Sequence, residues 1–239
     1  MRNIVNLNFK WAFSKEAEAV PASLPEKWYW VNLPHTWNAI DGQDGNNDYF
    51  RGTAYYAKKL TREDFPEAEQ YYLEFRGANS SADVYVNGKK LAHHDGGYST
   101  WRVNISNVLK DENVIEIDVD NAENDRVYPQ MADFTFYGGL YRDVNIIGVN
   151  EKHFDLDYYG SPSIKVTPEI TGKDAKIEIE VYVRNIETPT LIRYGELTND
   201  EFFVTEKAAK EGITITNTSQ TEPIVMLKHF AENPELVIE

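Results

Sequence analysis

The amino-acid sequence predicts an all-β chain, in which a jelly-roll β-sandwich is followed by a smaller immunoglobulin-like β-sandwich. Three observations support this fold class. Apolar and polar residues alternate along several short segments, an Asn-Gly pair separates two such segments, and helical periodicity is nearly absent. The chain has 239 residues, a length that suits one large β domain or two smaller ones.

Two segments show the alternation most clearly. In residues 113–121 the apolar positions are Ile115, Ile117 and Val119, and the acidic positions between them are Glu116, Asp118 and Asp120. In residues 176–184 the inward positions are Ile177, Ile179, Val181 and Val183. A period of two residues is typical of a strand with one face in the core and the other in water.

Asn87 and Gly88 lie between two strand-like runs within residues 82–91. Both residue types tolerate the positive φ angles of a tight two-residue turn, so the pair predicts a β-hairpin. The best helix candidate, residues 205–211, is short. Short strands with few helical segments indicate β-sandwiches.

A domain boundary is expected near residue 150. Residues 144–149 have the pattern of a last strand, and the alternation is then lost across residues 151–160. The division gives a first domain of residues 1–150, large enough for an eight-stranded jelly roll, and a second of residues 151–239. The second domain is slightly shorter than the roughly 100 residues of an immunoglobulin-like sandwich, so it could be incomplete.

The charge balance restricts the expected partners. Lys and Arg number 24 against 39 Asp and Glu, which gives a formal net charge of −15. Nucleic acids and anionic membranes would repel such a chain, and the acidity favours a neutral substrate over an anionic one. The chain has no cysteine, its first residues lack the apolar core of a signal peptide, and no run approaches the roughly 18 apolar residues of a membrane span. We therefore expect a soluble, cytoplasmic protein.

Several linked motifs of the first domain occur in an order and spacing that resemble a known family. They are residues 6–13, 31–38, 52–60, 75–82, 96–103 and 136–144. Together they resemble the sugar-binding N-terminal domain of glycoside hydrolase family two, which includes β-galactosidases, β-glucuronidases and β-mannosidases. The similarity covers about residues 4–148, and the following region resembles, less clearly, the immunoglobulin-like domain of that family.

The resemblance also implies a third domain, a catalytic (β/α) barrel with one glutamate as acid/base and one as nucleophile. A barrel needs at least roughly 200 residues, and the sequence has no such length after residue 239. The pair Asn150-Glu151 stands at the domain junction rather than after a barrel strand, so it is not expected to be catalytic. We therefore expect no catalytic residue and no organic cofactor in this chain.

Asp133 stands six positions before Gly139, among Phe134, Phe136 and Tyr137. The resemblance implies that this aspartate reaches the sugar in the active site and, in some β-galactosidases, ligates a sodium ion. A carboxylate accepts hydrogen bonds from two neighbouring hydroxyls, and the rings can exclude water from those bonds. The alternative is an aspartate that caps a loop through backbone N–H groups.

Asn79 matches the second position of the family that reaches the sugar. Its amide both donates and accepts, as an array of hydroxyls requires. The alternative is an asparagine that serves the backbone of a turn at a strand end. Because a sandwich can bring two strand ends to one rim, Asn79 and Asp133 are expected to share a sugar site.

The remaining polar candidates are expected to be structural. His35 should tether a loop, and the pair His93-His94 should not bind a metal because neighbouring residues of a strand point to opposite faces. Arg142 and Asp143 are expected to form an ion pair with each other.

Gly138 and Gly139 should permit a tight backbone path. Four of the five tryptophans are expected in the core or at a surface between domains, with stacking on a sugar as the alternative: Trp28, Trp30, Trp37 and Trp101.

The sequence thus predicts a non-catalytic N-terminal portion, or truncated form, of a family-two β-glycosidase, most similar to a β-galactosidase. Its partners would be a β-galactoside or related sugar and the catalytic barrel. The front of a β-glucuronidase remains an alternative, as do a free-standing carbohydrate-binding module and a structural domain that forms homo-oligomers.

Overall fold

The computed structural model describes residues 2–41, 49–132, 134–161, 163–171, 174–185, 190–192, 213–215 and 225–230. Over these residues the chain is β-structure with two short 3-10 helices, η1 (Arg62–Asp64) and η2 (Ser106–Val108). The all-β fold class is confirmed. In the same ranges, no helix is long and apolar enough to cross a membrane. The chain divides into two compact units, Arg2–Val149 and Asn150–Glu239.

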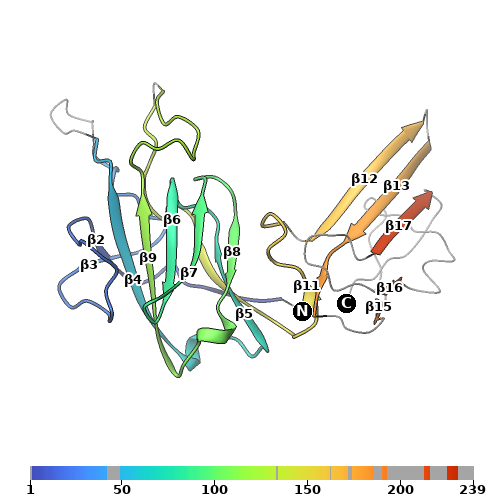
Figure 1. Ribbon diagram of the computed structural model, residues 1–239, viewed down its shortest axis with the longest axis horizontal. Coiled ribbons are helices and arrows are strands. Elements are labelled where there is room, and N and C mark those ends of the chain that lie inside the picture. Colours follow the sequence, from blue (N-terminus) through green and yellow to red (C-terminus); the bar gives the residue numbers. More distant parts are fainter. Residues whose placement is uncertain are drawn as a thin grey trace. The chain divides into compact units, whose positions relative to one another are not determined.

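The first unit contains two antiparallel sheets (Figure 1). The four-stranded sheet has the order β1-β10-β5-β8, and the six-stranded sheet has the order β3-β2-β4-β9-β6-β7. The smaller sheet consists of β1 (Asn3–Asn6), β5 (Gln70–Phe75), β8 (Trp101–Asn104) and β10 (Val144–Val149). The larger sheet consists of β2 (Trp11–Ser14), β3 (Tyr29–Val31), β4 (Thr53–Thr61), β6 (Ser81–Val86), β7 (Lys89–Asp95) and β9 (Glu112–Asp120).

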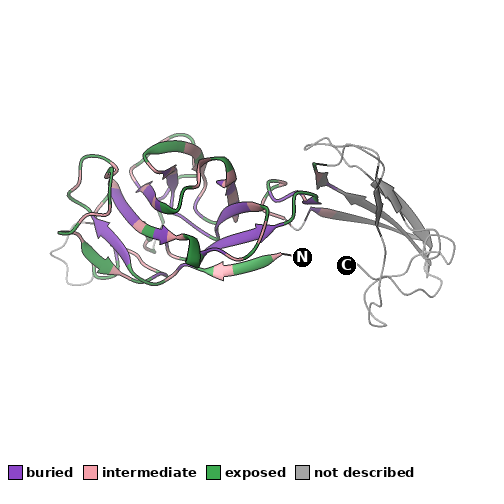
Figure 2. Cartoon of the chain, turned by 90° about the horizontal axis from the view of Figure 1, so that it is seen from below, coloured by how far each residue is buried: buried purple, intermediate pink, exposed green. Residues whose placement is uncertain are grey.

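The chain crosses from one sheet to the other after β1, β4, β5, β7, β8 and β9. Each of these connections lies at one end of the sandwich or the other, together with the strand ends that it joins. Alternate residues of both sheets face the space between them and form one core, which includes Tyr56, Leu73, Phe75, Ile117 and Ile146. Figure 2 shows this burial along the strands.

The predicted hairpin is confirmed. Strands β6 and β7 pair across Asn87 and Gly88, whose φ angles are 53° and 78°. The Asn87 side chain also accepts a hydrogen bond from Val114 N–H at 3.1 Å and so ties the turn to β9.

Strand β9 confirms the predicted alternation, with Ile115, Ile117 and Val119 in the core. The expectation that the opposite face meets water is wrong for Glu116, whose relative accessibility is 0%. This carboxyl is buried although it belongs to the outward-facing set of the strand.

The described strands of the second unit are also antiparallel. They form a sheet of β12 (Ile164–Thr171), β13 (Asp174–Val181) and β17 (Val225–Phe230), with two pairs, β11 (His153–Phe154) with β14 (Val183–Arg184) and β15 (Thr190–Ile192) with β16 (Ile213–Ile215). The strand predicted over residues 176–184 is therefore confirmed, with a break at Tyr182. The side chains of its predicted inward positions and the helix predicted over residues 205–211 lie outside what the structure describes.

Candidate functional site

The candidate site lies at the end of the first sandwich where β5 and β9 finish. Two connections meet there, residues 76–80 between β5 and β6 and residues 121–143 between β9 and β10. They are joined by a two-residue bridge in which Asn79 N–H donates to Gly139 O at 3.1 Å and Gly139 N–H donates to Asn79 O at 3.2 Å. The backbone around Asn79 is thereby fixed to the longer connection.

The side chain of Asn79 is almost fully buried, with 2% exposed. Its Nδ2 donates to Tyr137 O at 3.0 Å and makes a longer contact of 3.4 Å with Gln130 Oε1. Its Oδ1 has no hydrogen-bond partner among the described residues. Gly97 lies directly against it, because a Cβ at this glycine would come within 2.3 Å of Asn79 Oδ1.

Asp133 lies outside the described residues, so the sugar site that Asp133 and Asn79 are expected to share stays a prediction. The residues that precede and follow it are described. Gln130 on one side and Tyr137 on the other both contact the Asn79 amide. Asn79 therefore ties together the two ends of the segment that contains Asp133.

Aromatic side chains surround this end of the sandwich. We call Tyr98, Tyr128, Phe134 and Phe136 the aromatic rim. Their ring centroids are 5.4 Å apart between Tyr98 and Tyr128, 6.4 Å between Tyr128 and Phe136, and 4.8 Å between Phe134 and Phe136. Phe136 is buried, but Phe134 is 62% exposed and the nearby Tyr137 is 47% exposed. Exposed rings beside a polar group are suited to contact a sugar or another protein surface.

The phenols of Tyr128 and Tyr141 remain protonated at neutral pH. Burial raises the pKa of Tyr128 above its ordinary value, and burial likewise raises the pKa of Tyr141. Tyr141 donates its hydroxyl proton to Gly97 O at 2.5 Å and so holds the loop that faces Asn79. These groups act as neutral hydrogen-bonding groups rather than as bases.

His35 tethers the loop around Gly139, as predicted. Its Nδ1 lies 2.8 Å from the hydroxyl of Tyr56, and that hydroxyl accepts Leu140 N–H at 3.4 Å. Burial lowers the pKa of His35 to about 4, so the imidazole is neutral. Gly139 has a φ of 118°, and a Cβ there would lie 2.7 Å from His35 O, which confirms the tight backbone path.

Two further asparagines, which the sequence analysis did not single out, hold the loops at this end through side-chain hydrogen bonds. Asn38 Oδ1 accepts Gly138 N–H at 2.8 Å, and Asn121 Oδ1 accepts Gly52 N–H at 2.9 Å. The two side chains also meet, at 3.3 Å between Asn121 Nδ2 and Asn38 Oδ1. In the sequence, Asn38 follows a tryptophan and Asn121 stands at the end of a predicted strand. Both arrangements are too common to indicate a hydrogen-bond partner.

The predicted ion pair between Arg142 and Asp143 is wrong. Arg142 Nη1 instead donates to Tyr98 O at 3.0 Å, whereas Asp143 accepts Asn8 Nδ2 at 2.7 Å and lies 3.6 Å from Arg76 Nη1. Neighbouring residues in extended backbone point to opposite sides, so each side chain takes partners on its own side. The arginine contributes to the loop that carries Tyr98.

The two adjacent histidines also point to opposite sides. His93 lies between Asp83, at 2.6 Å, and Asp95, at 3.0 Å. His94 stacks on Trp101 with ring centroids 4.8 Å apart. Within the described residues, no group of His, Cys, Asp and Glu side chains has the arrangement of a metal site.

The tryptophans divide between core and surface. Trp37 and Trp101 are buried, whereas Trp30 on the edge strand β3 is largely exposed and Trp28 is intermediate. Trp28 lies 6.4 Å from the ring of Tyr55.

The fold and the site define a class of domain, an antiparallel β-sandwich with a polar and aromatic rim formed by the loops at one end. Residues 41–136 match the family described as "Glycosyl hydrolase 2 galactose-binding domain-like". The matched part of the first unit therefore has the sequence signature of the galactose-binding-like domains of glycoside hydrolase family two.

Known proteins of both specificities resemble the chain. It is 32% identical to a β-glucuronidase of Bacteroides fragilis over 185 residues, which are 76% of this chain and 26% of that protein. It is 25% identical to a β-galactosidase of Thermoanaerobacter pseudethanolicus over 98% of this chain and 31% of that protein. The crystal structure of an FMN-binding β-glucuronidase from Facaelibacterium prausnitzii L2-6 superposes with a TM-score of 0.69 at 32% identity, over 96% of this chain and 39% of that one.

The chain thus spans only about a quarter to a third of the length of these curated relatives. The similarity therefore covers a part of the chain that is shared by relatives named β-glucuronidase and relatives named β-galactosidase.

Proposed function

We propose that this chain is the sugar-binding, non-catalytic part of a β-glycosidase, in which Asn79 and Asp133 contact the substrate's sugar beside a catalytic barrel. The chemistry of acid/base and nucleophile would belong to the barrel. This division is supported by the family match of the first unit and by the lengths of the relatives, which are about three times the length of the chain.

The geometry of Asn79 is the observation that carries the proposal. Its amide group contacts Gln130 and Tyr137 on both sides of Asp133 and keeps Oδ1 without a hydrogen-bond partner in the described part of the chain. A buried acceptor that lacks a donor is costly, and a sugar hydroxyl could supply the missing hydrogen bond once the Gly97 loop that covers Oδ1 moves aside.

For the substrate we propose a β-galactoside, with a β-glucuronide as the alternative. The formal net charge of −15 favours a neutral sugar, because a uronate would be repelled at long range. Relatives carry both names, so the choice rests on this charge. A sodium ion near Asp133 in the full-length enzyme and a cytoplasmic location belong to the same proposal.

An NMR titration of the isotope-labelled chain tests this function. Methyl β-galactoside should shift the backbone amides of Asn79, Gln130 and Tyr137. Half of a pocket should bind weakly, because a dozen sugar atoms at about −0.3 kcal/mol per atom give roughly millimolar affinity. The substitution Asp133→Asn should weaken binding by about tenfold, since it removes charge-assisted hydrogen bonds.

The matched control is Asp125→Asn, which alters an exposed aspartate of the same connection. The proposal fails if no amide of this end shifts at saturating sugar, or if Asp133→Asn and Asp125→Asn bind equally well. Stronger shifts with methyl β-glucuronide would reverse the choice of substrate. The chain alone should not hydrolyse the 4-nitrophenyl glycosides of either sugar.

A free-standing carbohydrate-binding module is the second candidate, and the exposed rings of Phe134 and Tyr137 favour it. Such a module would stack sugar on these rings and bind an oligosaccharide without a barrel. Micromolar affinity that is lost in Phe134→Ala would support the module over the main proposal. If the rings serve instead to dock protein, the chain should self-associate in sedimentation experiments.

A further inference from the structure

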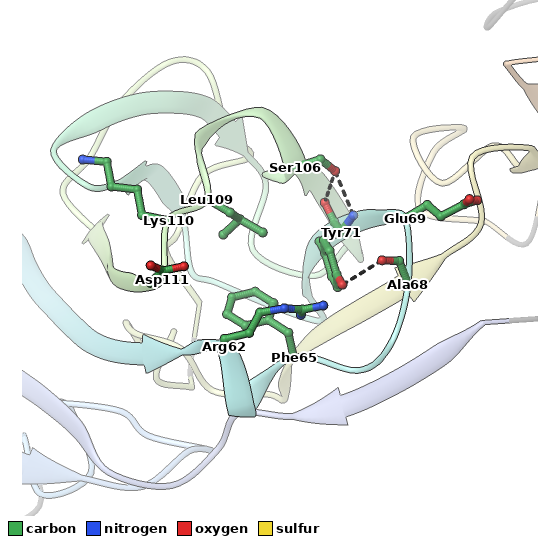
Figure 3. A pocket seen from close by; sticks show the side chains of 9 residues that line it. All are labelled: Arg62, Phe65, Ala68, Glu69, Tyr71, Ser106, Leu109, Lys110 and Asp111. Carbon is green, nitrogen blue, oxygen red and sulfur yellow. Dashed lines mark hydrogen bonds between the residues drawn. The ribbon is translucent and has the colours of Figure 1, made fainter.

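A pocket opens at the opposite end of the first sandwich from Asn79. The register of β4 and β9 pairs Thr53 with Asp120 near Asn79 and Thr61 with Glu112 at the other end. Nine residues of β4 separate these ends by roughly 25–30 Å. The pocket lies beyond Thr61, between η1 and η2, and has a volume of about 320 Å³ (Figure 3). This volume is within the range of small-molecule sites, roughly 300–1,000 Å³.

Apolar side chains form two sides of the pocket. Phe65 and Tyr71 meet edge to face, with ring centroids 5.4 Å apart and an interplanar angle of 84°. Leu109 lies across from them (Figure 3). The Tyr71 ring is held in place, because its hydroxyl donates to Ala68 O at 2.8 Å and its backbone N–H donates to Ser106 Oγ at 2.8 Å. The walls are therefore preformed.

One cation faces this apolar space. The guanidinium of Arg62 lies 5.6 Å from the centroid of the Tyr71 ring. Within the described residues Arg62 forms no ion pair, and neither does Lys110 at the edge of the pocket. Figure 3 shows the Glu69 carboxylate directed away from Arg62. A guanidinium is planar, so it can lie against a ring and at the same time donate two parallel hydrogen bonds to a carboxylate.

We propose that this pocket binds a small aromatic carboxylate. The carboxylate pairs with Arg62, and the ring lies between Leu109 and the pair Phe65–Tyr71. Asp111, at the edge of the pocket, accepts a hydrogen bond from a ring hydroxyl where the ligand carries one (Figure 3).

The walls favour an aromatic acid over a sugar acid. A uronate carries several hydroxyls, and those that meet Phe65, Tyr71 and Leu109 would lose water without gaining a partner. The charged lining residues Glu69, Lys110 and Asp111 are exposed, so they can serve only the part of a ligand that faces water. A flat aryl ring loses little hydration and packs against such side chains. A bare inorganic anion would use Arg62 but leave the apolar walls uncovered.

The proposal is independent of the proposed sugar site, because the two sites lie at opposite ends of one sandwich. It is tested by NMR titration of the whole chain with 4-hydroxybenzoate. Ten non-hydrogen atoms at the efficiency of small ligands predict a dissociation constant of about 1–10 mM. Saturable shifts should appear at the Leu109 methyl groups and at the Phe65 and Tyr71 amides, with Asn79 unaffected.

Arg62→Gln should weaken binding by at least about tenfold, because it removes a charge-assisted hydrogen-bond pair. Arg62→Lys keeps the charge but loses the planar group, so its affinity should be intermediate. The control is Lys89→Gln, an equal change of charge at an exposed residue of the hairpin at the same end. This variant should bind like the unaltered chain.

Three competing probes decide the chemistry. Benzyl alcohol tests the need for a carboxylate, and inorganic sulfate and glucuronate test the need for an aryl ring. Shifts of the same residues by any of these at equal affinity would overturn the proposal. So would the absence of saturable shifts with 4-hydroxybenzoate, or equal binding by Arg62→Gln and Lys89→Gln.

Discussion

The buried carboxyl of Glu116 should make the first unit less stable as pH rises. Its side chain is fully buried on the outward-facing side of β9, where Oε1 accepts Gly88 N–H at 3.2 Å. Its Oε2 has no hydrogen-bond partner among the described residues. Burial raises the pKa of Glu116 from 4.5 to about 7, because the charged form loses its hydration. Asp118, two residues on, also has a pKa raised by burial, from 3.8 to about 6.

The direction in which stability changes with pH follows from which state binds the proton more tightly. The folded state holds this proton more tightly than the unfolded state, so between pH 4.5 and about 7 folding is linked to proton uptake. The stability contributed by the neutral carboxyl is complete below pH 4.5 and is lost as pH rises towards 7. A pKa difference of about 2.5 units corresponds to about 3 kcal/mol at most, since one unit is worth about 1.4 kcal/mol.

Glu116→Gln keeps the shape and the acceptor for Gly88 but cannot ionise. It should raise the free energy of unfolding by about 1–3 kcal/mol at pH 8 and change it by less than about 1 kcal/mol at pH 4.5. Urea unfolding followed by tryptophan fluorescence is a suitable assay, because all five tryptophans lie within the first 101 residues. The signal therefore reports on the first unit alone.

The control is Glu112→Gln on the same strand, whose side chain is 69% exposed and paired with Lys59. An exposed pair contributes only about 0–1 kcal/mol, so this variant should keep the pH dependence of the unaltered chain. If Glu116→Gln and Glu112→Gln give the same slope of stability against pH, burial of Glu116 does not govern that slope.

Three further substitutions should destabilise the first unit in the same urea assay. Gly97→Ala should cost about 1–3 kcal/mol, because its Cβ would lie 2.3 Å from Asn79 Oδ1; an unchanged unfolding midpoint would mean that the contact relaxes freely. Tyr56→Phe should cost about 1–3 kcal/mol by leaving the buried groups that meet its hydroxyl without a partner, and a neutral effect would contradict the tether. Arg102→Met should cost about 3–5 kcal/mol, because it leaves the buried Glu74 carboxylate without the guanidinium 2.7 Å away; a loss below about 1 kcal/mol would show that other donors suffice.

The fold was predictable from the sequence because its determinants are local. Alternation fixes which residues of a strand face the core, and it placed Ile115, Ile117 and Val119 correctly. The positive φ angles of Asn87 and Gly88 are a property of the residue types, so the hairpin needed no knowledge of the rest of the chain.

Partners across the fold were not predictable in the same way. Arg142 and Asp143 are adjacent in sequence and opposite in charge, yet Arg142 bonds to Tyr98 O and Asp143 to Asn8, 135 residues away. Burial of Glu116 likewise depends on what covers the outward-facing side of the sheet, which alternation does not describe. A sequence pattern assigns a face to a side chain, and only the packed structure assigns its neighbours.

Asn79 shows both what a sequence can predict and what only the packed structure reveals. A strand end and a family motif pointed to Asn79 as a sugar contact, whereas the structure shows its amide bonded to the backbone of Tyr137 and to Gln130. The two roles are compatible, because the amide nitrogen serves the loop and the oxygen keeps an unused lone pair. An asparagine in this position can hold the loop through its nitrogen and keep its oxygen as an acceptor, whereas a carboxylate has no hydrogen to donate. The structural bond of Asn79 is thus the means by which its acceptor is positioned.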